Sequence, residues 1–202
     1  MKKADLSNIK NHKILFLGRS CEKIEKKFQE MNIPYTRTED PVTDAFVKDG
    51  KFTFGVSYEY DHIIPKDVIE CFQGRLVNLH LSFLPWNRGS NPNLWSFAEK
   101  TPCGVTIHAV DPGINTGDIL LQKQVTFDSI SSESTLCSTD RILAEEIEGL
   151  FCKNLKTIIQ DRFVRRKQTG SGSYHSRQQT EDYMSKLPKG IDTPINEITS
   201  AE

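Results

Sequence analysis

An asparagine and a histidine two positions apart, Asn78 and His80, are the side chains of this sequence best suited to catalysis. They fall in the largely apolar stretch 76–80, which predicts a strand, so both side chains point to the same face of it. A carboxamide N–H and an imidazole side by side can both donate to one oxygen, which is the layout of an oxyanion-stabilising site. In the alternative interpretation, the two side chains only satisfy backbone groups of the loop that follows.

The segments around this pair alternate between short apolar runs and amphipathic stretches. Strands are predicted at residues 13–19, 33–38, 52–58 and 76–80, and helices follow Ser20 and Pro65. This alternation favours an α/β fold with a doubly wound, mostly parallel, Rossmann-like sheet that helices cover on both faces. Ligand crevices of such sheets lie at the carboxyl ends of the strands, so the polar loop 81–93 is the expected place for chemistry.

The second half of the chain continues the pattern and then becomes polar. Strands are predicted at 104–110 and 118–127, and apolar residues three and four apart predict a helix over 134–161. We therefore expect a catalytic core, residues 1–165, and a C-terminal extension, residues 166–202, which wraps the core or is partly loose. Gly18 stands alone after the first strand, so no phosphate-binding GxGxxG turn is predicted there.

The composition is ordinary for a soluble globular protein. Among 202 residues, 26 Lys and Arg stand against 27 Asp and Glu, which gives a formal net charge of −1 and argues against a surface built as a whole for nucleic acid. No apolar run approaches the ~20 residues that span a bilayer, and no apolar core of a secretory signal follows the basic N-terminus. The five cysteines are widely spaced, without a CxxC pair, which predicts reduced thiols in a cytoplasmic protein.

Several segments together resemble the folate-dependent formyltransferases. That family carries N-x-H-x-S-x-L-P, a loop with Gly and Pro, and G-x-T-x-H followed by D-x-G-x-D-T-G-D. The matching residues are Asn78, His80, Ser82, Leu84 and Pro85, then Arg88, Gly89 and Pro92, then Gly104, Thr106 and His108, and finally Asp111, Gly113, Thr116, Gly117 and Asp118. The resemblance covers residues 13–165 and implies transfer of a formyl group from N10-formyltetrahydrofolate to an amine.

The resemblance also implies roles for single side chains. Asn78 and His80 would polarise the formyl oxygen and stabilise the tetrahedral adduct, while a carboxylate would help to remove a proton from the amine. The family's carboxylate falls at the position of Asn115, and a carboxamide cannot accept a proton at neutral pH. His108 is expected in the same neighbourhood, where it either orients residue 115 or is a satisfied core histidine.

Asn115 leaves three interpretations open. The chain is an active enzyme that uses another carboxylate, with Asp118 and Asp111 the nearest in sequence. It is a homologue that binds folate or sugar without efficient catalysis. Or the residue is a deliberate substitution made to trap a complex. If no other carboxylate has taken over, Asn115→Asp is expected to raise formyl transfer.

The formyl donor is expected in a pocket bordered by the segment 56–65, which resembles the family segment along the pterin. A pterin needs hydrogen bonds at its edge and two apolar faces. The residues expected to bind it are Ile63, Ile64, Leu84, Asp111 and Gly113. Alternatively, the two isoleucines only pack a helix onto the sheet. No metal is expected, because the histidines have no ligand partners at a fitting spacing.

The acceptor is expected to be the amine of a nucleotide-linked amino sugar. The loop Trp-Asn-Arg-Gly-x-Asn-Pro and the tail resemble the branch of the family that formylates such sugars. The hydroxyls of a sugar suit Asn side chains, its apolar face suits Trp, and the diphosphate of the nucleotide suits Arg. The residues expected to bind it are Trp86, Asn87, Arg88, Asn91 and His108. Glycinamide ribonucleotide is the alternative acceptor. A homodimer is an assembly that the sequence leaves open, and neither nucleic acid nor a membrane is an expected partner.

Overall fold

A six-stranded sheet forms the centre of the molecule, which a computed structural model describes for residues 9–127 and 134–198. Its strands, in the order β2-β1-β3-β4-β6-β7, are β1 (Ile14–Gly18), β2 (Tyr35–Thr38), β3 (Phe54–Tyr58), β4 (Leu76–His80), β6 (Gly104–Ala109) and β7 (Ile119–Gln124). The first four strands are parallel, whereas β6 is antiparallel to both β4 and β7. The predicted α/β fold with a mostly parallel sheet is confirmed.

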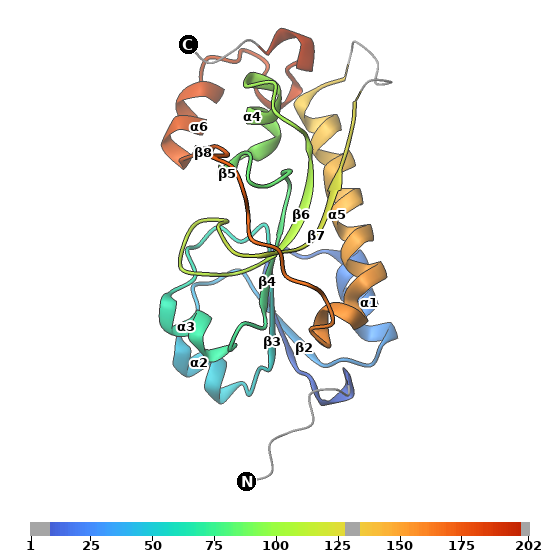
Figure 1. Cartoon of the computed structure of the whole chain (residues 1–202). Coiled ribbons are helices and arrows are strands. Elements are labelled where there is room, and N and C mark those ends of the chain that lie inside the picture. Colours follow the sequence, from blue (N-terminus) through green and yellow to red (C-terminus); the bar gives the residue numbers. More distant parts are fainter. Residues whose placement is uncertain (1–8, 128–133, 199–202) are drawn as a thin grey trace.

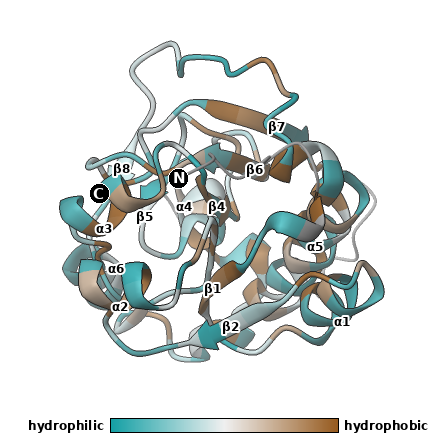
Figure 2. Ribbon diagram, turned by 90° about the horizontal axis from the view of Figure 1, so that it is seen from below, coloured by the Kyte–Doolittle hydropathy of each residue, from teal (hydrophilic) through white to brown (hydrophobic). Residues whose placement is uncertain are grey.

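Helices cover both faces of this sheet (Figure 1). One apolar core contains α1 (Glu22–Glu30) and α5 (Leu136–Ile159), and another contains α2 (Asp44–Asp49) and α3 (Lys66–Cys71). Strand β1 serves both cores, because successive side chains of a strand point to opposite faces. Its Ile14 and Phe16 pack in the first core, while Leu15 and Leu17 pack in the second. This is why the strand is an uninterrupted apolar run, and Figure 2 shows apolar residues on β1, β6 and β7.

The C-terminal extension folds back onto the segment that follows β4. The short strands β5 (Arg88–Gly89) and β8 (Tyr174–His175) pair in parallel. The 3-10 helix η1 (Ile9–Asn11), near the N-terminus, lies at the other end of the molecule (Figure 1). Residues of α4 (Pro92–Ala98), α6 (Arg177–Met184), η3 (Ile195–Glu197) and the start of α5 share a third apolar cluster. The 3-10 helix η2 (Gly190–Asp192) contacts α5. Residues 166–198 are therefore packed against β5, α4 and the start of α5.

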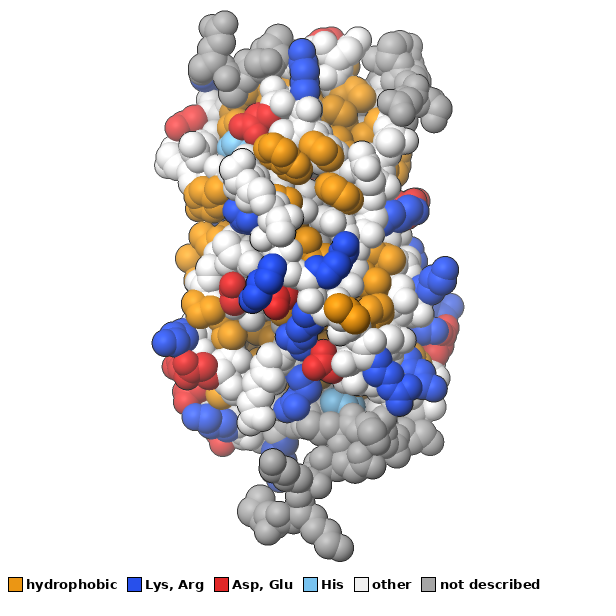
Figure 3. Space-filling view, viewed as in Figure 1, with side chains coloured by type: hydrophobic (Ala, Val, Ile, Leu, Met, Phe, Trp, Pro, Cys, Tyr) orange, Lys and Arg blue, Asp and Glu red, His pale blue; other side chains and the backbone are white. Residues whose placement is uncertain are grey.

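The surface carries charges of both signs. On the face drawn in Figure 3, Lys and Arg side chains are interspersed with Asp and Glu. Of the helices in the described ranges, none has the length and apolar character that crossing a membrane requires.

Candidate active site

A cavity of about 1020 Å³ lies where β1, β3 and β4 end. Its wall also includes the loops that follow β3 and β6, the segment after β5, the first turn of α5, and four residues of the C-terminal extension. Of the residues expected to bind or react with a ligand, those in the wall are Ile63, Ile64, Asn78, His80, Asn91, His108, Asp111, Gly113 and Asn115. The topology thus brings residues from both halves of the core to one place.

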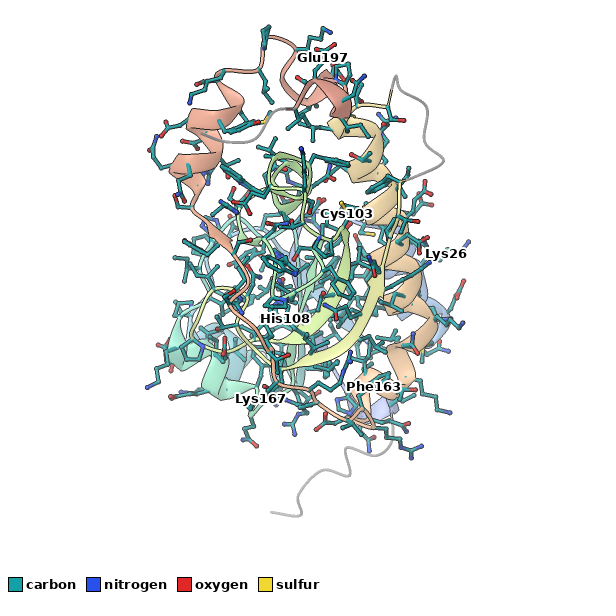
Figure 4. The ribbon with its side chains drawn as sticks, turned by 45° about the horizontal axis from the view of Figure 1, so that its top comes forward. Lys26, Cys103, His108, Phe163, Lys167 and Glu197 are labelled. Carbon is teal, nitrogen blue, oxygen red and sulfur yellow. The ribbon has the colours of Figure 1, made fainter. Side chains whose placement is uncertain are left out.

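His108 contacts two asparagines of this cavity, Asn78 and Asn115, and lies in the middle of the molecule (Figure 4). It stands directly opposite Asn78 in the antiparallel pair of β4 and β6. Its Nδ1 is 2.7 Å from the carbonyl oxygen of Ala109, which can only accept, so the proton is assigned to Nδ1. Its Nε2 is 3.2 Å from Nδ2 of Asn78 and 3.3 Å from Nδ2 of Asn115. One imidazole therefore orients two carboxamides.

The protonation state of His108 supports this assignment. The pKa of His108 is lowered to about 4, chiefly by burial, which outweighs the opposing effect of the Ala109 carbonyl and is aided by the Arg88 guanidinium. The ring is therefore neutral at physiological pH, and its Nε2 is an acceptor for both asparagine amides.

His80 is held in one tautomer by the loop that follows it. Its Nε2 is 3.0 Å from the carbonyl oxygen of Asn87, so this nitrogen carries the proton. Burial, together with the neighbouring His108, lowers the pKa of His80 to about 3, so the ring is neutral and its Nδ1 has an acceptor lone pair. The hydrogen bond to loop backbone is the one that the alternative interpretation expected. Nδ1 is therefore the ring nitrogen left as an acceptor, whereas the sequence suggested that this side chain donates.

Asn115 is fixed at both ends of its carboxamide. Its backbone has a φ of 55°, which asparagine tolerates better than most residues. Its Oδ1 accepts from the N–H of Gly89 at 2.9 Å, and its Nδ2 donates to His108. Asparagine therefore matches a neutral His108, since an aspartate would turn an oxygen toward the acceptor nitrogen.

Gln168 of the extension holds the loop that carries Asn115. Its Nε2 donates to the carbonyl oxygens of Asn115 and Gly117 at 2.8 and 2.9 Å, and its Oε1 accepts from Nε and Nη2 of Arg88 at 3.0 and 2.8 Å. Sequence reasoning missed Gln168, because it stands 53 positions from Asn115 and no local pattern marks it.

Asn87, expected to bind the acceptor, is instead part of the framework around His80. It is fully buried. Its Nδ2 donates to the hydroxyls of Ser96 and Thr101 at 2.9 and 2.8 Å, and its Oδ1 accepts from the hydroxyl of Ser173 at 2.9 Å. Because its amide is bonded within the protein, Asn87 positions the carbonyl that orients His80.

Four other expected site residues are not among the described residues that line the cavity. Arg88 is engaged with Gln168, and Leu84 is buried. Trp86 is only half-buried but lies outside the cavity wall. The carboxylate of Asp118 is 3.0 Å from Nζ of Lys167, outside the wall. Of the two carboxylates proposed to replace the one missing at position 115, only Asp111 reaches the cavity.

The carboxylates that do line the cavity come partly from places the sequence analysis did not consider. They are Glu59, Asp61, Asp111 and Asp140. Asp111 accepts from the hydroxyl of Thr116 at 2.7 Å. Burial raises the pKa of Glu59 against the opposing effect of Arg19. Burial also raises the pKa of Asp140, and the charge of Glu59 adds to that rise. Asp140 lies just after the first turn of the long helix α5, and no motif around it in the sequence marks it as a site residue.

Exposed apolar side chains gather at the cavity. Ile63 and Ile114, 81% and 43% exposed, come from loops of the core, and Tyr174 and Ile191, 48% and 55% exposed, come from the extension. Large apolar side chains left this open to solvent in a concave site indicate surfaces that a ligand covers. Within the described ranges, no three His, Cys, Asp or Glu side chains are grouped as a metal site would require.

Known proteins share this architecture. The family model described as formyl transferase matches residues 23–152. A methionyl-tRNA formyltransferase of Thermodesulfovibrio yellowstonii is 29% identical over 164 residues, which are 79% of this chain and 52% of that protein. The chain spans about half the length of the first curated relatives it matches.

Two solved structures match over most of their length. The formyltransferase PseJ from Anoxybacillus kamchatkensis, in complex with UDP-4,6-dideoxy-4-formamido-L-AltNAc and tetrahydrofolate, is 36% identical with a TM-score of 0.85, over 92% of this chain and 97% of that chain. The N-formyltransferase from Helicobacter canadensis, in complex with folinic acid and dTDP-3-aminofucose, has a TM-score of 0.68 over 95% of this chain and 84% of that chain. At 20% identity, the second likeness is one of fold.

Proposed function

Since the chain belongs to the formyl transferase family, we propose that it moves a formyl group from N10-formyltetrahydrofolate to the amine of a nucleotide-linked amino sugar. The observation that carries the proposal is the grouping of Asn78, His80 and Asn115 around His108 in a cavity. Likeness over nearly its whole length to PseJ, whose complex holds a UDP-linked formamido sugar and tetrahydrofolate, supports the acceptor. The longer methionyl-tRNA formyltransferases support formyl transfer but not this acceptor.

The residues present fit the formyl donor. Exposed Ile63 and Ile114, with half-buried Ile64, offer apolar surface to a pterin, and the backbone of 110–114 borders the same space. N10-formyltetrahydrofolate, when bound there, supplies the formyl carbon that the acceptor amine attacks.

The chain's own residues then handle charge and protons. Nδ2 of Asn78 gives one N–H to His108 and has a second to donate to an oxygen that gains negative charge. Nδ1 of His80 accepts the proton that the amine loses and passes it to the departing N10 nitrogen as the bond between N10 and the formyl carbon breaks, while Nε2 keeps its own proton on the Asn87 carbonyl. Asn115 positions the site and needs no proton-accepting role.

A transfer assay with three acceptors tests this function. We expect the wild-type chain and N10-formyltetrahydrofolate to formylate a UDP-linked 4-amino sugar, with the product seen by mass spectrometry as a gain of one formyl group. Glycinamide ribonucleotide and methionyl-tRNA should give no product. Formylation of glycinamide ribonucleotide would contradict the sugar assignment. Folate binding by calorimetry without transfer to any of the three would favour a non-catalytic binding protein.

Asn115→Asp is expected to lower transfer, opposite to the expectation from the resemblance. A carboxylate oxygen about where Nδ2 lies, 3.3 Å from His108 Nε2, places two acceptors in contact. Losing this hydrogen bond costs ~1–3 kcal/mol, or about five- to 150-fold in kcat/KM. The carboxylate also raises the pKa of His108 from about 4, so the loss should narrow as pH falls and the ring takes up a proton.

Kinetics from pH 5.5 to 8.5 and an NMR titration of His108 check this result. Asp118→Asn is the matched control, because its carboxylate pairs with Lys167 outside the cavity wall, and it should stay within about threefold of wild type. Higher activity in Asn115→Asp would show that a carboxylate at 115 is the missing base. A large loss in Asp118→Asn would show that Asp118 has taken its place.

A cytoplasmic location stays a prediction, and a homodimer stays an assembly that the sequence leaves open.

A further inference from the structure

We propose that Tyr174, in the C-terminal extension, is the platform on which the ring of the acceptor sugar lies, and that Arg177 binds the attached diphosphate. The inference rests on the proposed function, because it assigns a place to the same acceptor. It adds a specificity-determining segment that lies outside residues 23–152, the part matched by the family model.

The ring of Tyr174 lies beside the backbone that holds Asn115. A Cβ built on Gly89 would be 3.0 Å from Cε2 of Tyr174, so the ring is in contact range of Gly89. The N–H of Gly89 donates to Oδ1 of Asn115 at 2.9 Å. A molecule that lies on the Tyr174 ring is therefore next to the Asn115 carboxamide and close to the reacting groups.

Gly89 is what allows this approach. Its φ of +92° suits glycine, and a Cβ there would lie 2.1 Å from the carbonyl oxygen of His175, which is the register partner of Gly89 in the β5–β8 pair. The two strands can therefore come together only with glycine at position 89, and their pairing puts Tyr174 at the edge of the cavity.

Tyr174 presents a face for a ligand to cover. Its side chain lines the cavity and is 48% exposed. The apolar C–H face of a sugar ring packs well against an aromatic ring, and covering apolar area is favourable. The isoleucines of the core loops are assigned to the pterin. The group that lies beside Asn115, on the side of the extension, is therefore the sugar that carries the amine.

Arg177 stands where a diphosphate attached to that sugar would pass. It is three positions after Tyr174, at the start of α6, and it lines the same cavity. Its guanidinium pairs with Glu181 at 3.1 Å, but the pair is exposed and so is weakly held. Among the described residues of the wall, the other arginine is Arg19. It follows β1, and its guanidinium is 3.6 Å from the carboxylate of Asp61. Guanidinium groups bind phosphates with strong, charge-assisted hydrogen bonds.

Steady-state kinetics of Tyr174 variants test the platform. Tyr174→Ala should raise KM for the UDP-linked amino sugar about ten- to hundredfold through the lost contact area, with KM for N10-formyltetrahydrofolate unchanged within twofold. Tyr174→Phe keeps the ring and should stay close to wild type. Phe46→Ala is the matched control, because Phe46 is a similarly exposed aromatic residue outside the cavity wall, and it should leave both KM values unchanged.

Calorimetry with UDP alone tests Arg177 without turnover. Arg177→Ala should weaken UDP binding about tenfold, and the difference from wild type should shrink with added salt. Arg162→Ala, an exposed arginine outside the wall, should bind as wild type does.

The outcomes separate this inference from the proposed function. An active wild type whose KM for the nucleotide sugar does not respond to Tyr174→Ala, or that responds equally in Tyr174→Phe, contradicts the platform alone. Unchanged UDP binding in Arg177→Ala contradicts the diphosphate site. No formylated sugar from the wild type contradicts the proposed function, and this inference with it.

Discussion

His80→Gln lowers kcat/KM for formyl transfer by about 10²–10⁴-fold in a protein that stays folded. The reason is the tautomer. The amide nitrogen of glutamine reaches about as far from the backbone as the histidine Nε2, so it can still donate to the carbonyl of Asn87, as Nε2 does at 3.0 Å, and the loop keeps its anchor. The glutamine has no atom that takes up a proton at neutral pH, so the base is lost.

Kinetics and thermal unfolding of the variant check this prediction together. The loss should appear in kcat, while calorimetry should show unchanged binding of 5-formyltetrahydrofolate. Turnover within tenfold of wild type in His80→Gln, with a normal unfolding temperature, would remove His80 from the reaction.

The acidic limb of the wild-type pH profile gives a further check on His80. Because burial lowers the pKa of His80 to about 3, its base form persists at every pH from 5 upward. The decline of kcat/KM on the acid side should therefore follow protonation of the acceptor amine. An acceptor with a less basic amine should move that limb to lower pH, whereas a limb that stays in place would belong to a group of the enzyme.

Asn78→Ala is expected to reduce kcat by about 10²–10³-fold, because it removes a hydrogen-bond donor to the oxygen that becomes negative. In the folded protein Nδ2 of Asn78 is held 3.2 Å from His108 Nε2, directly across the β4–β6 pair. This contact leaves its second N–H oriented in advance, and alanine supplies none. KM for the formyl donor should change far less than kcat, since the donor pocket is built mainly by the loops after β3 and β6.

Asn154→Ala is the matched control for this asparagine. Asn154 lies on α5, where its Nδ2 donates to the carbonyl of Leu150 in the same helix, and its loss should leave kcat unchanged. A kcat of Asn78→Ala within tenfold of wild type would contradict the role of Asn78 as the oxyanion donor.

Local pattern was enough to locate the first two members of the site. Asn78 and His80 share one face because side chains alternate along a strand, and both line the cavity at the end of β4. The spacing of apolar residues likewise predicts α5, observed at Leu136–Ile159 against the expected 134–161. The six-residue helix α2 was not predicted, because fewer than two turns give too little periodicity to recognise.

The direction of a strand and the partners of a polar side chain lie beyond such patterns. That β6 runs antiparallel to β4 places His108 across from Asn78, and the strand's own residues do not reveal this. Asn87 and Asn115 are both loop asparagines in the sequence. One is fully buried around His80 while the other reaches the cavity, because the surrounding chain determines which polar groups are bonded internally.

The sequence by itself determined the α/β class, the strand that carries Asn78 and His80, and the residues 23–152 by which the chain belongs to its family. Short-range periodicity encodes the class and the strand, since these depend on neighbours within a few positions, and the joint occurrence of separate motifs carries the family. Only the tertiary structure decided the proton positions on His80 and His108, the hold of Gln168 on Asn115, and the place of Tyr174 beside Gly89. Each of these depends on atoms that folding brings together, so no stretch of sequence contains it.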